Sequence, residues 1–140
     1  MAGDDWHHFV GDWELTVDLP GAEDVRSQVV FELLGPLLVQ RTTVPVPGAP
    51  DSLCVVATRD DGSYVQHYFD SRGVARLYEM TYDGHLWTLE RTRPDFTPLD
   101  FHQRYVGRFA NDRNTITGEW QSSPDGVNWT KDFGLILRRS

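Results

Sequence analysis

Alternating hydrophobic and polar residues run through most of the chain, beginning close to the N-terminus. After the segment Phe9-Val10-Gly11, the apolar residues Trp13, Leu15 and Val17 alternate with polar neighbours. A period of two residues is typical of a β-strand with one buried face. The pattern therefore predicts a first strand whose tryptophan points into the core.

The same alternation recurs in nine further segments joined by short connections. Asp61-Gly62 and Asp83-Gly84 separate alternating runs, which is a strong signal of a β-hairpin. The proline-bearing segments 45–50 and 93–99 are expected as rim loops, because proline lacks the backbone donor of a central strand. Asp95 and Asp100 are expected to be solvated there. The expected strands cover residues 12–18, 25–34, 37–44, 53–59, 64–69, 74–82, 85–92, 101–109, 115–121 and 129–138.

About ten evenly spaced strands and no long helix indicate a sandwich or a barrel. We predict an all-β fold in which residues 1–140 form one closed antiparallel up-and-down barrel. The acidic residues Asp4 and Asp5 favour a short N-terminal helical turn before the first strand. Trp6 and Phe9 would then plug one end of the barrel, and Trp13 would seal an end beneath the first strand.

The composition narrows the class of protein. Hydrophobic residues make up 39% of the chain and aromatic residues 12%, which is too rich for a disordered segment. A net charge of −8 argues against nucleic acid or an anionic membrane as a partner. The single Cys54 and the lack of a signal-peptide pattern predict a soluble, cytoplasmic protein without a membrane span.

The inward face can be carried from strand to strand if the turns have the expected lengths. A one-residue bulge would invert the assignment in any strand, and in segment 37–44 the choice between Gln40 and Arg41 stays open. Cys54, Val56 and Thr58 are assigned to the interior, with Cys54 as a core residue. The other residues assigned to the interior include Val65, His67, Phe69, Arg76, Tyr78, Met80, Trp87, Leu89, Arg91, Gln103, Tyr105, Phe109, Ile116, Trp120, Lys131, Phe133, Leu135 and Leu137.

This interior contains too many polar side chains for a packed core. A buried cation without a partner costs several kcal/mol, and the assignment contains no inward acid. Either these side chains line a wet cavity for an anionic or carbonyl-bearing ligand, or the register is shifted and some of them face solvent. The predicted ligand-binding residues are His67, Arg76, Tyr78, Trp87, Arg91, Gln103, Tyr105, Trp120, Lys131 and Phe133.

Several motifs resemble those of a known group of barrels. The opening Phe9-Val10-Gly11-Asp12-Trp13 and the closing Arg138-Arg139 resemble the calycin superfamily, which includes lipocalins, fatty-acid-binding proteins and nitrobindins. Segments 68–73 and 118–120 are most similar to small bacterial barrels of unknown function in that group. The resemblance implies a bacterial ligand-binding barrel with a cavity for an apolar molecule, and it implies no shared reaction.

The chain departs from two branches of this superfamily. Segment 19–24 is too short for the two portal helices that follow the first strand of fatty-acid-binding proteins. Nitrobindins carry a haem-ligating histidine late in the chain, whereas no histidine here follows His102. Haem is therefore not expected. No other cofactor and no metal site is predicted, because the histidines lack metal-ligand spacing.

Three functions remain open at this point. The first is a small-molecule-binding barrel for a largely apolar or amphipathic organic ligand that bears an anionic or carbonyl group. The second is an enzyme of secondary metabolism (a cyclase, isomerase or lyase) with His67 and Tyr78 as acid–base groups. The third is a packed barrel that acts through its surface, for example as a homodimer through Tyr64, Tyr68 and Leu77.

Overall fold

The computed structural model describes residues 6–96, 98 and 100–140 of the protein as an all-β fold. The predicted strands are all present, with ends that differ by a few residues. They are β1 (Gly11–Val17), β2 (Ser27–Leu34), β3 (Leu37–Thr43), β4 (Ser52–Thr58), β5 (Tyr64–Asp70), β6 (Ala75–Tyr82), β7 (Leu86–Arg91), β8 (His102–Phe109), β9 (Thr115–Ser123) and β10 (Thr130–Arg139).

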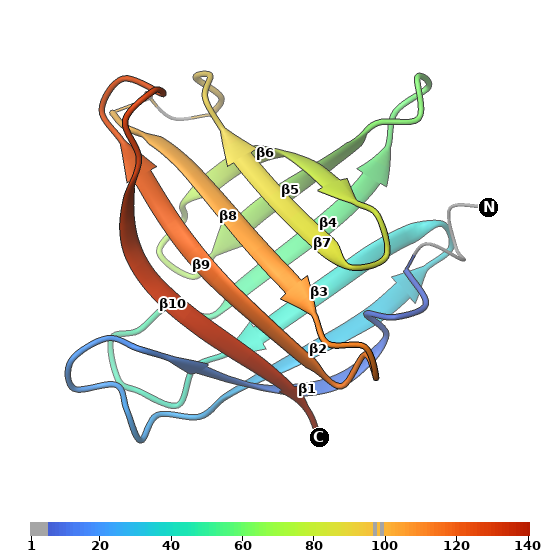
Figure 1. Ribbon diagram of the computed structural model, residues 1–140, viewed down its shortest axis with the longest axis vertical. Helices are drawn as coiled ribbons and strands as arrows, with labels where there is room; N and C mark the ends of the chain where they lie inside the picture. The colour runs from blue at the N-terminus through green and yellow to red at the C-terminus, as the bar shows by residue number, and fades with distance from the viewer. Residues whose placement is uncertain (1–5, 97, 99) are drawn as a thin grey trace.

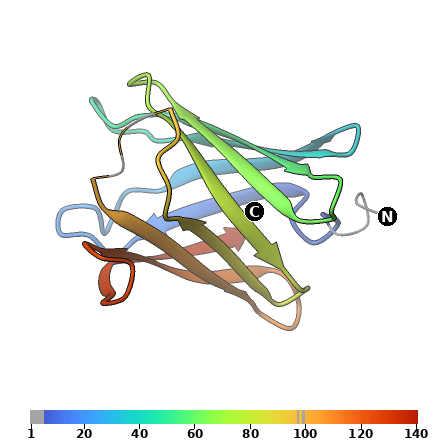
Figure 2. The ribbon, with the colours of Figure 1, turned by 90° about the horizontal axis from the view of Figure 1, so that it is seen from above.

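These strands form one closed sheet in which each strand pairs antiparallel with its neighbours in sequence. β1 closes the ring on β10, with Trp13 opposite Arg139 and Val17 opposite Leu135. Figures 1 and 2 show the tilted strands from two sides as they wrap around a common interior. The predicted closed up-and-down barrel is confirmed.

The predicted N-terminal helical turn is not supported by the structure. Residues 6–9 form a hydrogen-bonded turn, in which the Phe9 backbone N–H donates to the Trp6 carbonyl at 3.0 Å, and no helix occurs in the described residues. The acidic residues Asp4 and Asp5, on which the prediction relied, lie outside the described part of the chain. No helix in the described ranges is long and apolar enough to cross a bilayer.

An aromatic cluster, which we call the plug, fills the end of the barrel where β1 begins. Trp6, Phe9 and Trp13 are completely buried. The Phe9 ring packs edge-on against Trp87 and Phe109, with centroids 5.2 and 5.0 Å apart. The predicted closure of one end by Trp6 and Phe9 is therefore confirmed, and it explains why the chain turns back on itself before β1.

Arg139 at the end of β10 holds the plug in place. Its guanidinium lies 4.1 Å from the centre of the Trp13 ring and donates to the backbone carbonyls of Val10 and His8 at 2.9 and 2.8 Å. Gly11 has a φ of 132°, and a Cβ at this position would lie 2.8 Å from the Arg139 Nη1 atom. The Gly-x-Trp motif thus makes room for the arginine that closes the barrel.

The predicted inward face of β5 is wrong. Cys54 pairs with Tyr68, and Tyr68 pairs with Arg76, so Tyr68 shares the inward face of these two residues. The connections at both ends of β5 are one residue longer than assumed, and each contains a glycine with a positive φ, Gly62 at 87° and Gly73 at 86°. The residues of β5 that face inward are Tyr64, Gln66 and Tyr68, and those that face outward are Val65, His67 and Phe69.

Each of the two longer turns shifts the register by one residue, so their effects cancel and the predicted inward face of β4 stays correct. Cys54 and Val56 are buried inside the barrel as predicted, with exposures of 5% and 3%, whereas Thr58 is exposed at the end of the strand. In β3, Gln40 lines the interior, and Arg41 faces outward, where its Nε donates to Glu32 at 3.0 Å. The alternative left open for this strand is thereby resolved.

A β-bulge in β10 overturns the prediction for Lys131. The register shifts between Lys131 and Phe133, so that Phe133, Leu135 and Leu137 face inward while Lys131 lies outside. The Lys131 ammonium forms an ion pair with Asp18 at 3.1 Å, and both side chains are about half exposed.

Candidate functional site

A cavity of about 260 Å³ lies inside the barrel, between the plug and the opposite ends of the strands. Side chains from every strand except β2 line it. Trp87, Tyr105 and Trp120 supply aromatic surface, whereas the remaining polar side chains lie mainly on β3 to β6 and β8. No acidic side chain is among the described residues that line this cavity.

Seven of the ten predicted binding residues line this cavity. They are Arg76, Tyr78, Trp87, Gln103, Tyr105, Trp120 and Phe133. β6, β7 and β8 bring five of these side chains together, because a two-residue period places alternate residues of neighbouring strands on the same face. Their common location is established, and their role in binding remains a prediction.

His67 and Lys131 lie on the outside of the barrel. The His67 ring stacks on Phe69, with centroids 6.3 Å apart and planes inclined by 17°. The predicted acid–base pair of His67 and Tyr78 therefore does not exist, since only Tyr78 lines the cavity. The predicted surface of Tyr64, Tyr68 and Leu77 is also wrong, because Tyr64 packs against Trp6 and Tyr68 lines the cavity.

Arg91 is buried but does not line the cavity. Its guanidinium forms an ion pair with Asp95 at 2.9 Å, and both side chains are 3% exposed. Arg91 also donates to the Pro98 carbonyl at 3.2 Å, and the Asp95 carboxylate accepts the backbone N–H of Leu77 at 2.8 Å. The expected solvation of Asp95 is thus wrong, and the interior cation that appeared to lack an acid has one from a rim loop.

Arg76 is the cation that faces the cavity, and it forms no ion pair with any described residue. Its Nε–H is buried and has no acceptor. The neighbouring Tyr78 hydroxyl donates to the Gln103 side-chain oxygen at 2.7 Å. Burial raises the pKa of Tyr78, and Arg76 opposes this rise. Tyr78 is therefore a neutral hydrogen-bond donor at neutral pH.

Sequence reasoning missed Gln66 and Tyr68 and left Gln40 undecided. Gln66 is 3% exposed, lines the cavity and has no hydrogen-bond partner in the described part of the chain. The sequences Asp60-Asp61-Gly62 and Ser71-Arg72-Gly73 carried the signal that could have found them. A glycine late in a three-residue loop favours a turn with a left-handed residue, and such a turn shifts the register by one.

Two aromatic side chains of the cavity wall also keep unused donors. The Trp87 indole N–H and the Tyr105 hydroxyl are buried without a partner in the described residues. Burial raises the pKa of Tyr105 above its ordinary value, so the hydroxyl keeps its proton. All the unused groups named so far, on Arg76, Trp87, Tyr105 and Gln66, can donate a hydrogen bond, and none carries a negative charge.

The cavity offers neither an activated thiol nor a metal site. Burial raises the pKa of Cys54 to about 12, so its sulfur is a protonated thiol at neutral pH. No group of three or more His, Cys, Asp or Glu residues that could hold a metal occurs among the described residues. No histidine is among the described residues that line the cavity.

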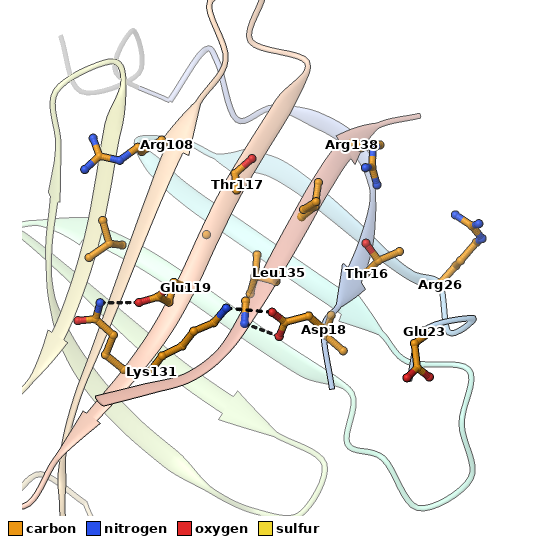
Figure 3. A pocket seen from close by; sticks show the side chains of 16 residues that line it. Thr16, Asp18, Glu23, Arg26, Arg108, Thr117, Glu119, Lys131, Leu135 and Arg138 are labelled. Atoms are coloured by element: carbon orange, nitrogen blue, oxygen red, sulfur yellow. Dashed lines mark hydrogen bonds and ion pairs between the residues drawn. The ribbon is translucent and has the colours of Figure 1, made fainter. Parts of the chain in front are cut away.

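A larger hollow of about 890 Å³ lies on the outer surface, over β8, β9, β10 and the segment after β1. Figure 3 shows Lys131 bonded to Asp18 and Glu119 bonded to Gln121, whereas Glu23, Arg108 and Arg138 are drawn without a bond to the other lining side chains. Asp18 accepts a hydrogen bond from the Gly134 backbone N–H at 2.6 Å. This bond is the main cause of the lowered pKa of Asp18, and the bond from Lys131 lowers it further. Asp18 and Glu119 are thus already bonded, and the interior cavity is the better candidate site.

Comparisons with protein-family models and with curated proteins found no match. Among solved structures, the chain is similar to that of Rv2717c from M. tuberculosis, with a TM-score of 0.62 and 15% sequence identity. The similarity covers 99% of this chain and 97% of that chain. At this level of identity the similarity concerns the barrel fold alone.

Proposed function

We propose that this protein is a calycin-like carrier that binds a small, largely apolar organic molecule inside the barrel. The molecule carries an anionic or carbonyl group that bonds to Arg76. The observation that supports this proposal is the guanidinium of Arg76, which faces the cavity without an ion-pair partner in the described residues. The same cavity wall supplies a cation for the polar group of the ligand and aromatic rings for its apolar part.

A partly buried guanidinium is costly unless an anion or several acceptors compensate it. Asp95 and Asp70 do not compensate the charge of Arg76, because Asp95 forms an ion pair with Arg91 and Asp70 forms one with Arg72. A ligand carboxylate supplies the missing charge and can bond to a guanidinium through two parallel hydrogen bonds. The aromatic rings around it supply apolar contact.

Binding without turnover is the activity that we propose. The enzymatic alternative required a histidine base in the cavity, and His67 faces outward. Tyr78 has a raised pKa and is a poor base at neutral pH. The remaining side chains can hold and orient a ligand, but they offer no basic group to accept a proton.

A titration with benzoate tests this function. Benzoate is a flat ring with one carboxylate, and isothermal titration calorimetry measures its Kd directly. We expect binding to the unmodified protein and a loss of about 10- to 100-fold in Arg76→Gln, since a hydrogen bond to a charged group contributes about 1.5–3 kcal/mol. Native mass spectrometry of the purified protein would show whether a small acid is already bound.

Arg108→Gln provides the matched control. Arg108 lies on β8 with its side chain exposed on the outer surface, so this substitution removes the same charge from outside the cavity. Its benzoate affinity should equal that of the unmodified protein. Equal affinities for all three proteins, or no binding to any of them, would refute a binding role for Arg76.

A further inference from the structure

We propose that the ligand is a small heterocyclic acid that combines a carboxylate with an amide-like N–H and C=O edge on the same ring. This inference rests on the proposed binding function and names the class of ligand that the cavity would select. The hydrogen-bonding groups of the cavity wall that lack a partner among the described residues carry it, because they include the carboxamide of Gln66 and the NH2 group of Gln103 in addition to the guanidinium of Arg76.

Gln66 is the first of these carboxamides. Its side chain is 3% exposed, lines the cavity, and bonds to no other described residue. Neither amide atom of Gln66 is among the fully buried polar atoms that lack a partner in the described part of the chain, so both atoms are accessible from the cavity to a ligand. An amide side chain both donates and accepts, so its complement is a ligand edge that presents an N–H beside a C=O.

Gln66 and Arg76 lie on neighbouring strands and face the same cavity. Gln66 pairs with Tyr78, and Tyr68 pairs with Arg76, so the two residues are diagonal neighbours across β5 and β6. Diagonal neighbours on one face of a sheet are about 7–8 Å apart. Long side chains span this distance, so one ring with two polar edges can reach both residues.

Gln103 is the second carboxamide, and it extends the same polar wall. Its side-chain oxygen accepts a hydrogen bond from the Tyr78 hydroxyl at 2.7 Å. The NH2 group is therefore the part of the amide that can bond to a ligand. That NH2 group donates to no described residue. Gln103 therefore adds a donor for a second carbonyl of the ligand.

The size and the walls of the cavity restrict the ligand to about one ring. A volume of about 260 Å³ lies just below the range of about 300–1,000 Å³ that is usual for ligand pockets. Rings of Trp87, Tyr105 and Trp120 pack against one another along one side, with centroids 4.8 and 5.2 Å apart. The planes of these rings are inclined to one another by 67° and 49°, so an aromatic ligand can pack edge-to-face against them.

Three probes separate the two polar contacts. Orotate has a carboxylate and an amide edge, benzoate has only the carboxylate, and uracil has only the amide edge. We expect orotate to bind about 10-fold or more tightly than either of the others in calorimetric titrations. Arg76→Gln should remove the advantage of orotate over uracil, and Gln66→Leu should remove its advantage over benzoate.

Gln28→Leu is the control for the second substitution, because Gln28 is exposed on β2. Gln66→Met is a second variant of similar size, and urea unfolding verifies that each variant is folded. Equal affinity for orotate and benzoate, or an unchanged preference in both Gln66 variants, would overturn the ligand class while the proposed function stands. If none of the three probes binds, the proposed function itself fails.

Discussion

Tyr105 lies across the inward faces of Gly107 and Gly118, so its ring occupies the space that two side chains would need. A Cβ at Gly107 would lie 2.5 Å from the Tyr105 hydroxyl, and a Cβ at Gly118 would clash with the same atom. We expect Gly118→Ala to lower the free energy of unfolding by about 1–3 kcal/mol, the usual cost of overpacking. Urea denaturation measures this change.

The double variant Gly118→Ala/Tyr105→Leu provides the control for that prediction. Because the smaller side chain removes the clash, the two substitutions together should destabilise the protein by less than the sum of their separate effects. Additive effects would show that Tyr105 does not depend on the two glycines for its position.

Arg139 connects the end of the chain to its beginning through its guanidinium. We expect Arg139→Lys to lower the free energy of unfolding by about 2 kcal/mol, because lysine cannot bond to the carbonyls of Val10, His8 and Arg113 in this geometry. Arg138→Lys, on the exposed neighbour, should change stability by less than about 0.5 kcal/mol. Thermal and chemical denaturation measure both changes. Equal stability of the two variants would contradict the expected contribution of the Arg139 contacts to stability.

In the turn between β5 and β6, the Asp70 carboxylate accepts several hydrogen bonds. They come from the Arg72 guanidinium at 2.6 Å, the Tyr68 hydroxyl at 2.7 Å and the Arg72 backbone N–H at 2.9 Å. The Arg72 side chain, above all, holds the pKa of Asp70 well below its ordinary value. A carboxyl with a lowered pKa in the folded state stabilises the protein above its unfolded pKa of about 3.9.

That stabilisation is lost as the pH falls from about 4 through the folded pKa of Asp70. We therefore expect the free energy of unfolding to decrease on acidification, and Asp70→Asn to weaken this dependence. Urea titrations between about pH 2.5 and 6 measure both slopes. Asp60→Asn, in an exposed turn, serves as the control. An unchanged slope in Asp70→Asn would contradict the expected role of this turn.

The loop after β7 should depend on its buried ion pair. Removing one partner of a buried pair costs about 3–5 kcal/mol, and Asp95→Asn should approach the lower end because Arg91 also donates to Pro98. Arg93→Gln breaks an ion pair with Glu79 that is largely exposed, and should cost less than about 1 kcal/mol. Equal losses in chemical denaturation would show that the Asp95 contact contributes little.

The strands could be predicted from the sequence because their two-residue period is a local pattern. Which residues of β5 point into the barrel could not be predicted in this way. Its inward residues depend on two turns whose glycines adopt positive φ, and one extra residue in a turn reverses the whole face. The same limit applies to Lys131, where a bulge in β10 follows from long-range pairing. Arg91 could not be matched to Asp95, because a ten-residue segment with two prolines leaves its path open.

The barrel as a whole separates an acidic exterior from a cavity in which the charged residue among the described lining residues is the cation Arg76. The protein has a net charge of −8, yet no acidic side chain is among the described residues lining the cavity. The predicted location in the interior is therefore correct for Arg76 and Gln103, which line the cavity, and wrong for His67 and Lys131, which do not. This contrast makes Arg76 the centre of the proposed function.

Side-chain NMR of the arginine Nε–H groups tests that claim most directly, with benzoate as the probe. We predict that the Arg76 Nε–H resonance, assigned by its loss in Arg76→Gln, shifts on addition of benzoate, because the ligand carboxylate becomes its missing acceptor. The resonance of Arg91, which is bonded to Asp95, should move little. An unchanged Arg76 resonance at saturating benzoate, with shifts confined to exposed arginines, would contradict the account.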